Sequence, residues 1–254
     1  MKVALIRVGI DKVCGGICSP LFKDGTYEFV PIPEYFYRSN AFDAKKVKTY
    51  STEKGKSGTP FIDYFKTEGK DKEQHRDCPI HNDPEFNTFT YGDGNHTKGA
   101  LVNLEKGDFI VFYALFEGFD TNIAPGMYIF GYFEVANSML VAEQDQYELV
   151  SEEFKNNFHI RNKEIFDRDI NNPKNKGLKL VKGTENSRKL KYAYAISRAL
   201  PSQSKKSDIH VISDEMMQIF GNFGGKIAIQ KDPLRWITNK ELVAKTVTWL
   251  KGLE

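Results

Sequence analysis

The densest group of chemically versatile side chains lies within sixteen residues and consists of His81, Asp83, Asp93 and His96. Turn-forming residues surround them, which places them on loops, where functional sites commonly lie. A histidine beside a carboxylate can act as general acid and base near neutral pH, or can bind a divalent metal. The alternative is that they are ordinary turn formers. We favour a functional role for His81 and Asp83 over one for Asp93 and His96.

A second group follows the first hydrophobic segment and joins Arg7 and Asp11 to Gly15, Gly16 and Ser19. Successive glycine amides can form a concave nest for phosphate, and an arginine can bind phosphate oxygens with two N–H groups. Asp11 could hold a ribose or the edge of a base, or act as a general base. The alternative is a tight loop capped by Asp11 and Ser19.

We expect these two groups to converge on one pocket. They would share one rim of a sheet if the strand predicted at Met1–Val8 neighbours the strand predicted at Phe109–Phe116. Tyrosines near the loops add surfaces on which a base could stack, at about 1–3 kcal/mol per base. The predicted catalytic residues are His81, Asp83 and Asp11, and the predicted nucleotide-binding residues are Arg7, Gly15, Gly16, Ser19, Tyr35 and Tyr91.

The cysteines leave a zinc site open in principle. Cys14, Cys18, Cys78 and His81 supply a suitable ligand set, but the C-x3-C spacing is loose and its partners are 60 residues away. An odd number of cysteines also argues against a disulfide framework. We favour buried thiols, and we predict neither a metal ligand nor a cofactor.

Two aromatic-rich apolar segments are the firmest structural signal. Phe109–Phe116 follows the turn Lys106-Gly107-Asp108, and Met127–Val135 follows a ten-residue loop. Their length and turn boundaries predict two buried central strands joined as a hairpin. Gly131 within the second strand predicts a bulge or a barrel bend.

The remaining segments carry weaker signals. Asp24-Gly25 predicts a turn that pairs Ile17–Phe22 with Tyr27–Val30. Ser151 is typical of a helix start, and the Asn- and Lys-rich segment 156–188 is typical of a loop. Helix signals also lie at Ser213–Gly221 and after the capping box that begins at Thr238.

Composition bounds the class of protein. The 254 residues are 40% hydrophobic and 28% charged, which excludes a disordered or fibrous chain. No apolar run approaches the 18 residues of a membrane span, and MKVALIRVGI lacks the features of a signal peptide. We therefore expect a cytoplasmic protein with a single domain at 1–254, and a Lys-rich insertion at about 39–76, part of which Thr59–Phe65 would attach to the core.

Charge is unevenly distributed although the net charge is only +2. Residues 45–76 carry nine Lys and Arg against five Asp and Glu, and residues 155–191 carry eleven against four. Such segments favour either solvated loops or a phosphate-binding surface.

Several phrases, taken in order, resemble the nucleotide modification associated domain family, third type. The resemblance rests on Arg7-x-Gly9-x-Asp11, Gly15-Gly16, Ser19-Pro20, Asp24-Gly25, Pro31-Ile32-Pro33-Glu34, His81-Asn82-Asp83-Pro84, Gly107-Asp108 before FIVFYALFEG, and YIFGYFEV. It covers nearly the whole chain except residues 39–76. The loop YGDGNH departs from the glutamine-containing phrase expected near Tyr91–Gly94. The strand pair also resembles the small barrels of the PUA, ASCH and EVE group.

The resemblance implies an α+β fold with a mixed, largely antiparallel sheet or a small PUA-like β-barrel, peripheral helices and long polar insertions. It implies a protein of a DNA base-modification system that binds nucleic acid or a nucleotide, including a modified base, with base-modification enzymes as further partners. Two alternatives remain: an enzyme acting on a nucleotide or base through a His/Asp site, and a structural scaffold of a modification complex.

Overall fold

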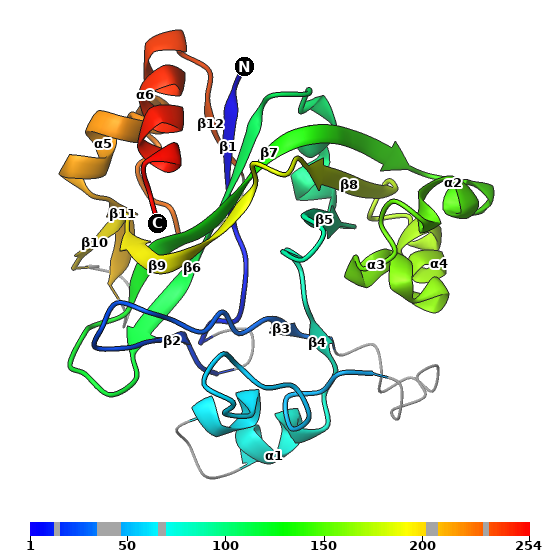
Figure 1. Cartoon of the computed structure of the whole chain (residues 1–254), viewed down its shortest axis with the longest axis horizontal. Helices are drawn as coiled ribbons and strands as arrows, with labels where there is room; N and C mark the ends of the chain where they lie inside the picture. The colour runs from blue at the N-terminus through cyan, green and yellow to red at the C-terminus, as the bar shows by residue number, and fades with distance from the viewer. Residues whose placement is uncertain (13–15, 35–46, 66–69, 202–207, 231–233) are drawn as a thin grey trace. The chain divides into compact units, whose positions relative to one another are not determined.

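The chain folds into two units built from interleaved segments (Figure 1). The structure is a computed structural model that describes residues 1–12, 16–34, 47–65, 70–201, 208–230 and 234–254. The larger unit comprises Met1–Arg7, Asp83–Tyr113 and Gly126–Glu254, and the smaller unit comprises Val8–Asn82 and Ala114–Pro125. That the whole chain acts as one domain stays a prediction.

A mixed, largely antiparallel sheet organises the larger unit, as predicted. Its strands in spatial order are β12 (Arg235–Ile237), β1 (Val3–Arg7), β6 (Phe109–Gly118), β7 (Gly126–Val141), β8 (Leu178–Gly183) and β5 (Thr90–Asp93), with β9 (Arg188–Ala195) paired to β7. β1 runs parallel to β6 in the register Val3 to Phe109, which confirms that these two strands are neighbours. The barrel alternative is wrong, because within the described chain β12 and β5 end the sheet as short strands of three and four residues that do not pair.

The two central strands are buried because their sequences are apolar on both faces. Phe112 of β6 and Phe133 of β7 are fully buried, with ring centroids 4.7 Å apart. The pairing of β7 with β9 shifts register between Ile129 and Gly131, which confirms the predicted irregularity. A Cβ at Gly131 would lie 2.5 Å from Phe86, so glycine makes room for that aromatic ring.

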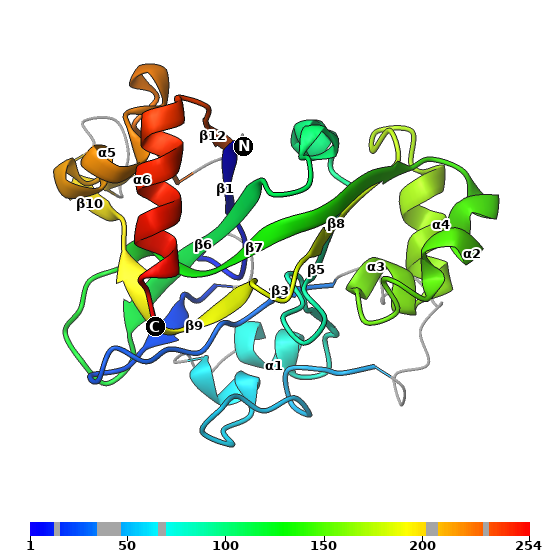
Figure 2. The same ribbon diagram turned by 45° about the horizontal axis from the view of Figure 1, so that its top comes forward.

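Short helices gather beside the far end of the β7–β8 hairpin, as both ribbon views show (Figures 1 and 2). They are η4 (Gln144–Gln146), α2 (Tyr147–Ser151), α3 (Phe158–Arg161) and α4 (Lys163–Asn171). The expected loop over 156–188 is therefore wrong, as is the helix start at Ser151, where α2 ends. Asn157 and Asn162 cap α3 and α4 with side-chain oxygens, and Phe166 anchors α4 in the core. Asparagine is unfavourable in the interior of a helix but favourable at its N-cap. An Asn-rich segment can therefore look like a loop although it contains two helix starts.

The C-terminal part of the larger unit adds two further α-helices. The described elements there are β10 (Ser197–Leu200), β11 (Ile209–Ile212), α5 (Asp214–Phe220), η5 (Phe223–Gly225) and α6 (Lys240–Lys251), and η3 (His96–Asn103) lies earlier in the chain. Ser213 caps α5 and Gly221, at φ 76°, ends it, as predicted. The cap of α6 is Asn239 rather than Thr238, and α6 packs on α5 through Trp249 and Phe220, whose ring centroids are 5.4 Å apart.

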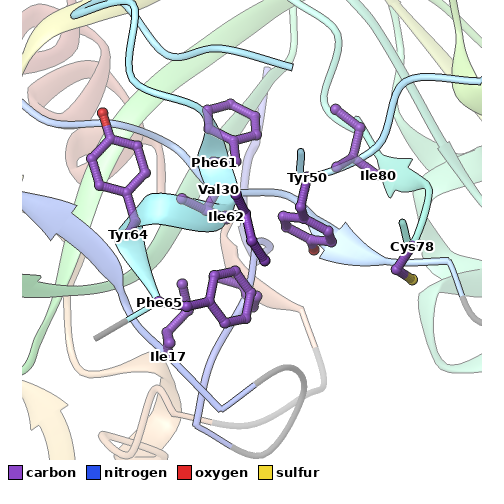
Figure 3. Close-up of a cluster of buried hydrophobic side chains, with 10 residues drawn as sticks. Ile17, Val30, Tyr50, Phe61, Ile62, Tyr64, Phe65, Cys78 and Ile80 are labelled. Atoms are coloured by element: carbon purple, nitrogen blue, oxygen red, sulfur yellow. The ribbon is translucent and has the colours of Figure 1, made fainter. Parts of the chain in front are cut away.

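The described residues of the smaller unit form little regular structure, and ten of them form an apolar core (Figure 3). Its elements are β2 (Ser19–Leu21), β3 (Ile32–Pro33), η2 (Phe61–Tyr64), α1 (Lys70–Arg76) and β4 (Ile80–His81). Tyr50, Phe61, Ile62, Tyr64 and Phe65 belong to that core, which confirms that Thr59–Phe65 attaches the polar segment.

The expected hairpin at Asp24-Gly25 forms only in part. Leu21 and Tyr27 make one antiparallel bridge around the turn, where Gly25 has φ 81°. β2 instead pairs in parallel with the last residues of β6, Ser19 opposite Phe116. β2 therefore pairs with β6 along one edge, while on its other edge the Glu28 N–H donates to the carbonyl of Pro20.

Candidate functional site

A series of charged side chains lies in the interior of the larger unit. His159 Nδ1 is 2.5 Å from Asp169 Oδ2, and His159 Nε2 is 3.6 Å from Asp83 Oδ2. Arg168 binds the other oxygen of Asp169 at 2.8 Å. The side chains of His159, Asp83 and Asp169 are at most 6% exposed. Two carboxyl groups therefore flank one imidazole away from solvent.

Different elements position these groups. Asp83 precedes β5, whose Gly92 N–H donates to Asp83 Oδ2 at 2.8 Å. Asn157, the cap of α3, donates to the same oxygen at 3.3 Å and accepts from the backbone N–H of His159. A Cβ at Gly92 would lie 2.7 Å from His159 Cδ2, so glycine permits this close approach. Asp169 comes from α4.

Burial and neighbouring charges shift the pKa values of Asp83, His159 and Asp169. Burial raises the pKa of Asp83 to about 8, against the opposing charge of His159. Burial disfavours the charged imidazole, but the Asp169 carboxylate outweighs it and raises the pKa of His159. Burial would also raise the pKa of Asp169, yet His159 and Arg168 lower it to about 2.

One atom of this cluster lacks a partner. Within the described chain, Oδ1 of Asp83 is buried and makes no hydrogen bond. Burying a neutral carboxylic acid without a partner costs far less free energy than burying a carboxylate, which agrees with the raised pKa of Asp83. The arrangement can hold a proton between Asp83 and His159, either for acid–base chemistry or to stabilise the fold.

The smaller unit holds a pocket of about 150 Å³ next to the glycine-rich loop. Its lining includes Lys12, Gly16, Cys18, Tyr64, Glu117 and Phe119. The rings of Tyr64 and Phe119 meet edge to face, with centroids 5.4 Å apart, and Phe119 is 37% exposed. Lys12 Nζ lies 3.6 Å from Glu117 Oε1. The pocket thus combines an accessible aromatic ring with one cation and one anion.

Cys18 in this pocket is a protonated thiol. Burial, followed by the charge of Glu117, raises its pKa to about 12. Only the thiolate acts as a nucleophile or metal ligand, so these surroundings disfavour both roles. Cys78 is also buried, and its Sγ lies 3.7 Å from the carbonyl oxygen of Glu34. Cys14 lies outside the described residues.

The predicted nucleotide-binding residues have varied surroundings. Gly16 lines the pocket, has φ 81°, and donates its N–H to the carbonyl of Asp11. Ser19 is fully buried, and its hydroxyl accepts from the backbone N–H of Val30. Arg7 donates to the carbonyl oxygen of Gln230. Gly15 and Tyr35 lie outside the described residues.

His81 and Tyr91 also have clear partners. His81 lies opposite Ile32 in the β3–β4 pair, with Nδ1 3.5 Å from Glu34 Oε2. Tyr91 is 4% exposed, donates its hydroxyl to Asp93, and packs against Phe112, so this packing does not favour base stacking. The convergence of Asp11 and His81 on one pocket stays a prediction.

Several basic side chains in residues 155–191 bind groups of the protein itself. Lys179 is 2% exposed and donates to four backbone carbonyls, including those of Gly94 and Gly177. Lys163 pairs with Asp167, and Arg168 with Asp169. The charge excess therefore overstates the basic surface that a polyanion would meet.

Sequence reasoning did not identify His159, Asp169, Glu117 or Phe119. The available signal for His159 and Asp169 was that each follows an asparagine that can cap a helix. Asn157 caps the helix of His159, and Asn162 caps the helix of Asp169. Glu117 is the next-to-last residue of β6, and Phe119 directly follows the strand, so a charged and an aromatic residue occur together where the apolar segment ends.

Comparisons with known proteins support the resemblance drawn from the sequence. No curated protein and no solved structure matched the chain. In the part of the chain that the structure describes, no helix is both long enough and apolar enough to cross a membrane. The model of the family described as Nucleotide modification associated domain 3 matches residues 2–245. The chain therefore belongs to the nucleotide modification associated domain 3 family.

Proposed function

We propose that the protein recognises a nucleotide, free or within a nucleic acid, by holding its base in the pocket of the smaller unit. The observation that carries the proposal is the combination in one pocket of Phe119, Lys12 and Glu117 beside Gly16. An aromatic face binds the base by stacking, whereas lysine binds phosphate as a point charge. The family name, which associates these domains with nucleotide modification, agrees with such a ligand.

The size of the pocket supports a single base. Sites for drug-sized ligands span roughly 300–1,000 Å³, whereas this pocket has about 150 Å³. A planar ring fits this space, and its sugar and phosphate would remain outside. The exposure of Lys12, whose side chain is 57% accessible, allows it to reach a phosphate there.

Gly16 supports the same ligand. It has φ 81°, a conformation that glycine adopts without strain, and a Cβ at this position would meet no atom within 4 Å. The backbone therefore borders open space at the pocket. A ligand can approach the backbone closely there. Because the Gly16 N–H already donates to the carbonyl of Asp11, a phosphate would be bound by Lys12 rather than by this amide.

Binding of nucleoside monophosphates tests the proposal. Phe119→Ala should weaken binding about 5- to 150-fold, since stacking contributes about 1–3 kcal/mol per base. Leu149→Ala is the matched control, because Leu149 is 78% exposed and lies in the larger unit. Titration calorimetry that finds no binding to the wild type, or equal binding by the Phe119 variant, would contradict the proposal.

A second candidate function is an enzyme acting on a nucleotide or base. The observation that favours it is the buried Asp83–His159 pair, since strongly shifted pKa values often mark catalytic groups. Asp83 would act as acid or base, with His81 and Asp11 as further candidates. Turnover of nucleotides and of modified DNA tests it. Product formation that survives both Asp83→Asn and His81→Ala would exclude these residues.

A further inference from the structure

We infer that Glu117 makes the pocket selective for bases whose amino group is on C4 of a pyrimidine or C6 of a purine, so that cytosine and adenine bind in preference to uracil and thymine. This inference rests on the proposed function, because it assumes that a base enters the pocket. It adds the chemical class of base and the residue that selects it.

The backbone holds Glu117 at a defined position. The residue lies in β6 opposite Pro20 of β2, next to Cys18 and two residues before Phe119. Its side chain is 31% exposed, so most of it is covered while the carboxylate still borders the pocket. A base stacked on Phe119 would therefore present an edge towards this carboxylate.

Glu117 also lies beside the Cys18 thiol. Burial and the charge of Glu117 raise the pKa of that thiol, so it stays protonated and adds no competing negative charge. A carboxylate has about four acceptor sites, so Glu117 has capacity to accept from a donor of the ligand.

The charge of Glu117 determines which donor it can accept. The N4 amino group of cytosine and the N6 amino group of adenine are donors, and an acidic side chain commonly accepts from the former. Uracil and thymine present the O4 carbonyl at the same place, where an acceptor would face an acceptor. Leaving such polar groups unpaired gives strong discrimination between otherwise similar ligands.

The ion pair with Lys12 does not prevent this role. Its atoms are 3.6 Å apart, and the lysine side chain is 57% exposed. Exposed pairs of this kind contribute about 0–1 kcal/mol. Lys12 can therefore leave Glu117 and pair with a phosphate at a small cost in free energy, while Glu117 accepts from the base.

The test measures dissociation constants of the full chain for the 5′-monophosphates of cytidine, adenosine, uridine and thymidine. We expect the wild type to bind the first two at least tenfold more tightly than the last two. Glu117→Gln should bring the ratio close to one, because an amide can also donate to O4. Glu185→Gln, at an exposed position of the larger unit, is the matched control and should keep the wild-type ratio.

The outcomes separate the two proposals. Equal binding of all four nucleotides by the wild type, with weaker binding by Phe119→Ala, would overturn the selectivity and leave base recognition standing. No binding of any nucleotide would overturn the proposed function itself. If Glu117→Gln does not fold, Glu117→Asp provides the test: the shorter side chain should reduce the ratio severalfold, and an unchanged ratio would overturn the inference.

Discussion

His159 Nδ1 lies 2.5 Å from Asp169 Oδ2 in the interior of the larger unit, and Asp83 lies 3.6 Å from the other ring nitrogen. Helix α3 carries the histidine and helix α4 carries Asp169, so the contact joins two short helices. Helices of four and nine residues are marginal by themselves. The buried charge pair therefore ties a locally weak segment to the sheet.

Asp169→Asn should destabilise the protein by about 3–5 kcal/mol, the typical effect of removing one partner from a buried ion pair. Asp167→Asn is a matched control on the same helix, because Asp167 pairs with Lys163 at the surface. The control should cost about 0.2–0.5 kcal/mol. Urea unfolding followed by circular dichroism measures both, and equal values for the two variants would contradict the structural role of Asp169.

Stability should fall as the pH rises from about 5 to 9. The pKa values of Asp83 and His159 are raised in the folded state. Their contributions are therefore fully present below the unfolded-state values, about 3.9 and 6.5, and are lost as the pH rises through the folded values. The pKa of Asp169 is lowered to about 2, so its contribution is lost only as the pH falls from about 4 towards 2.

Asp83→Asn separates these effects, because a neutral side chain at this position cannot release a proton. We expect a flatter decline in the free energy of unfolding between pH 5 and 9 than in the wild type. Asp145→Asn, at an exposed position, should reproduce the wild-type profile. A decline as steep in the Asp83 variant as in the wild type would show that Asp83 does not cause it.

Gly92→Ala should destabilise the larger unit by about 1–3 kcal/mol, the usual cost of overpacking. The added Cβ would lie 2.7 Å from His159 Cδ2 and 2.9 Å from Asn157 Oδ1. Gly99→Ala is the control, since a Cβ there meets no atom within 4 Å. Thermal unfolding of the two variants compares the positions, and a neutral Gly92→Ala would mean that the helix can move away.

Cys18 should react slowly with iodoacetamide at neutral pH, because only the thiolate reacts. With a pKa of about 12, its rate should still rise about tenfold per pH unit between pH 8 and 10. Glu117→Gln removes a neighbouring negative charge and should speed the reaction. Mass spectrometry of the Cys18 peptide measures the rate, and a plateau above pH 9 would contradict the raised pKa.

Binding of a short single-stranded oligonucleotide should depend only weakly on salt. One phosphate neutralised by Lys12 gives a slope of about −0.7 in log affinity against log salt. Lys12→Ala should bring the slope towards zero, whereas Lys155→Ala, which breaks a comparable surface pair with Glu152, should not change it. A wild-type slope of several units would instead indicate an extended nucleic-acid surface.

Local signals determined much of the fold. The apolar runs of β6 and β7, the irregularity at Gly131 and the cap at Ser213 could all be predicted, because each depends on residues near in sequence. The helices α3 and α4 could not, since their asparagine-rich composition is typical of loops. Their stability comes from burying residues such as Phe166, which is a tertiary effect.

The candidate sites depended still more on tertiary structure. The sequence identified Asp83 and Gly16 as candidates, but it could not show that Asp83 faces a histidine 76 positions later or that Gly16 shares a pocket with Glu117. Such partners meet only when strands and helices pack. Burial then decides which carboxyl keeps its proton and which stays charged, because the cost of a buried charge depends on neighbours that no local pattern specifies.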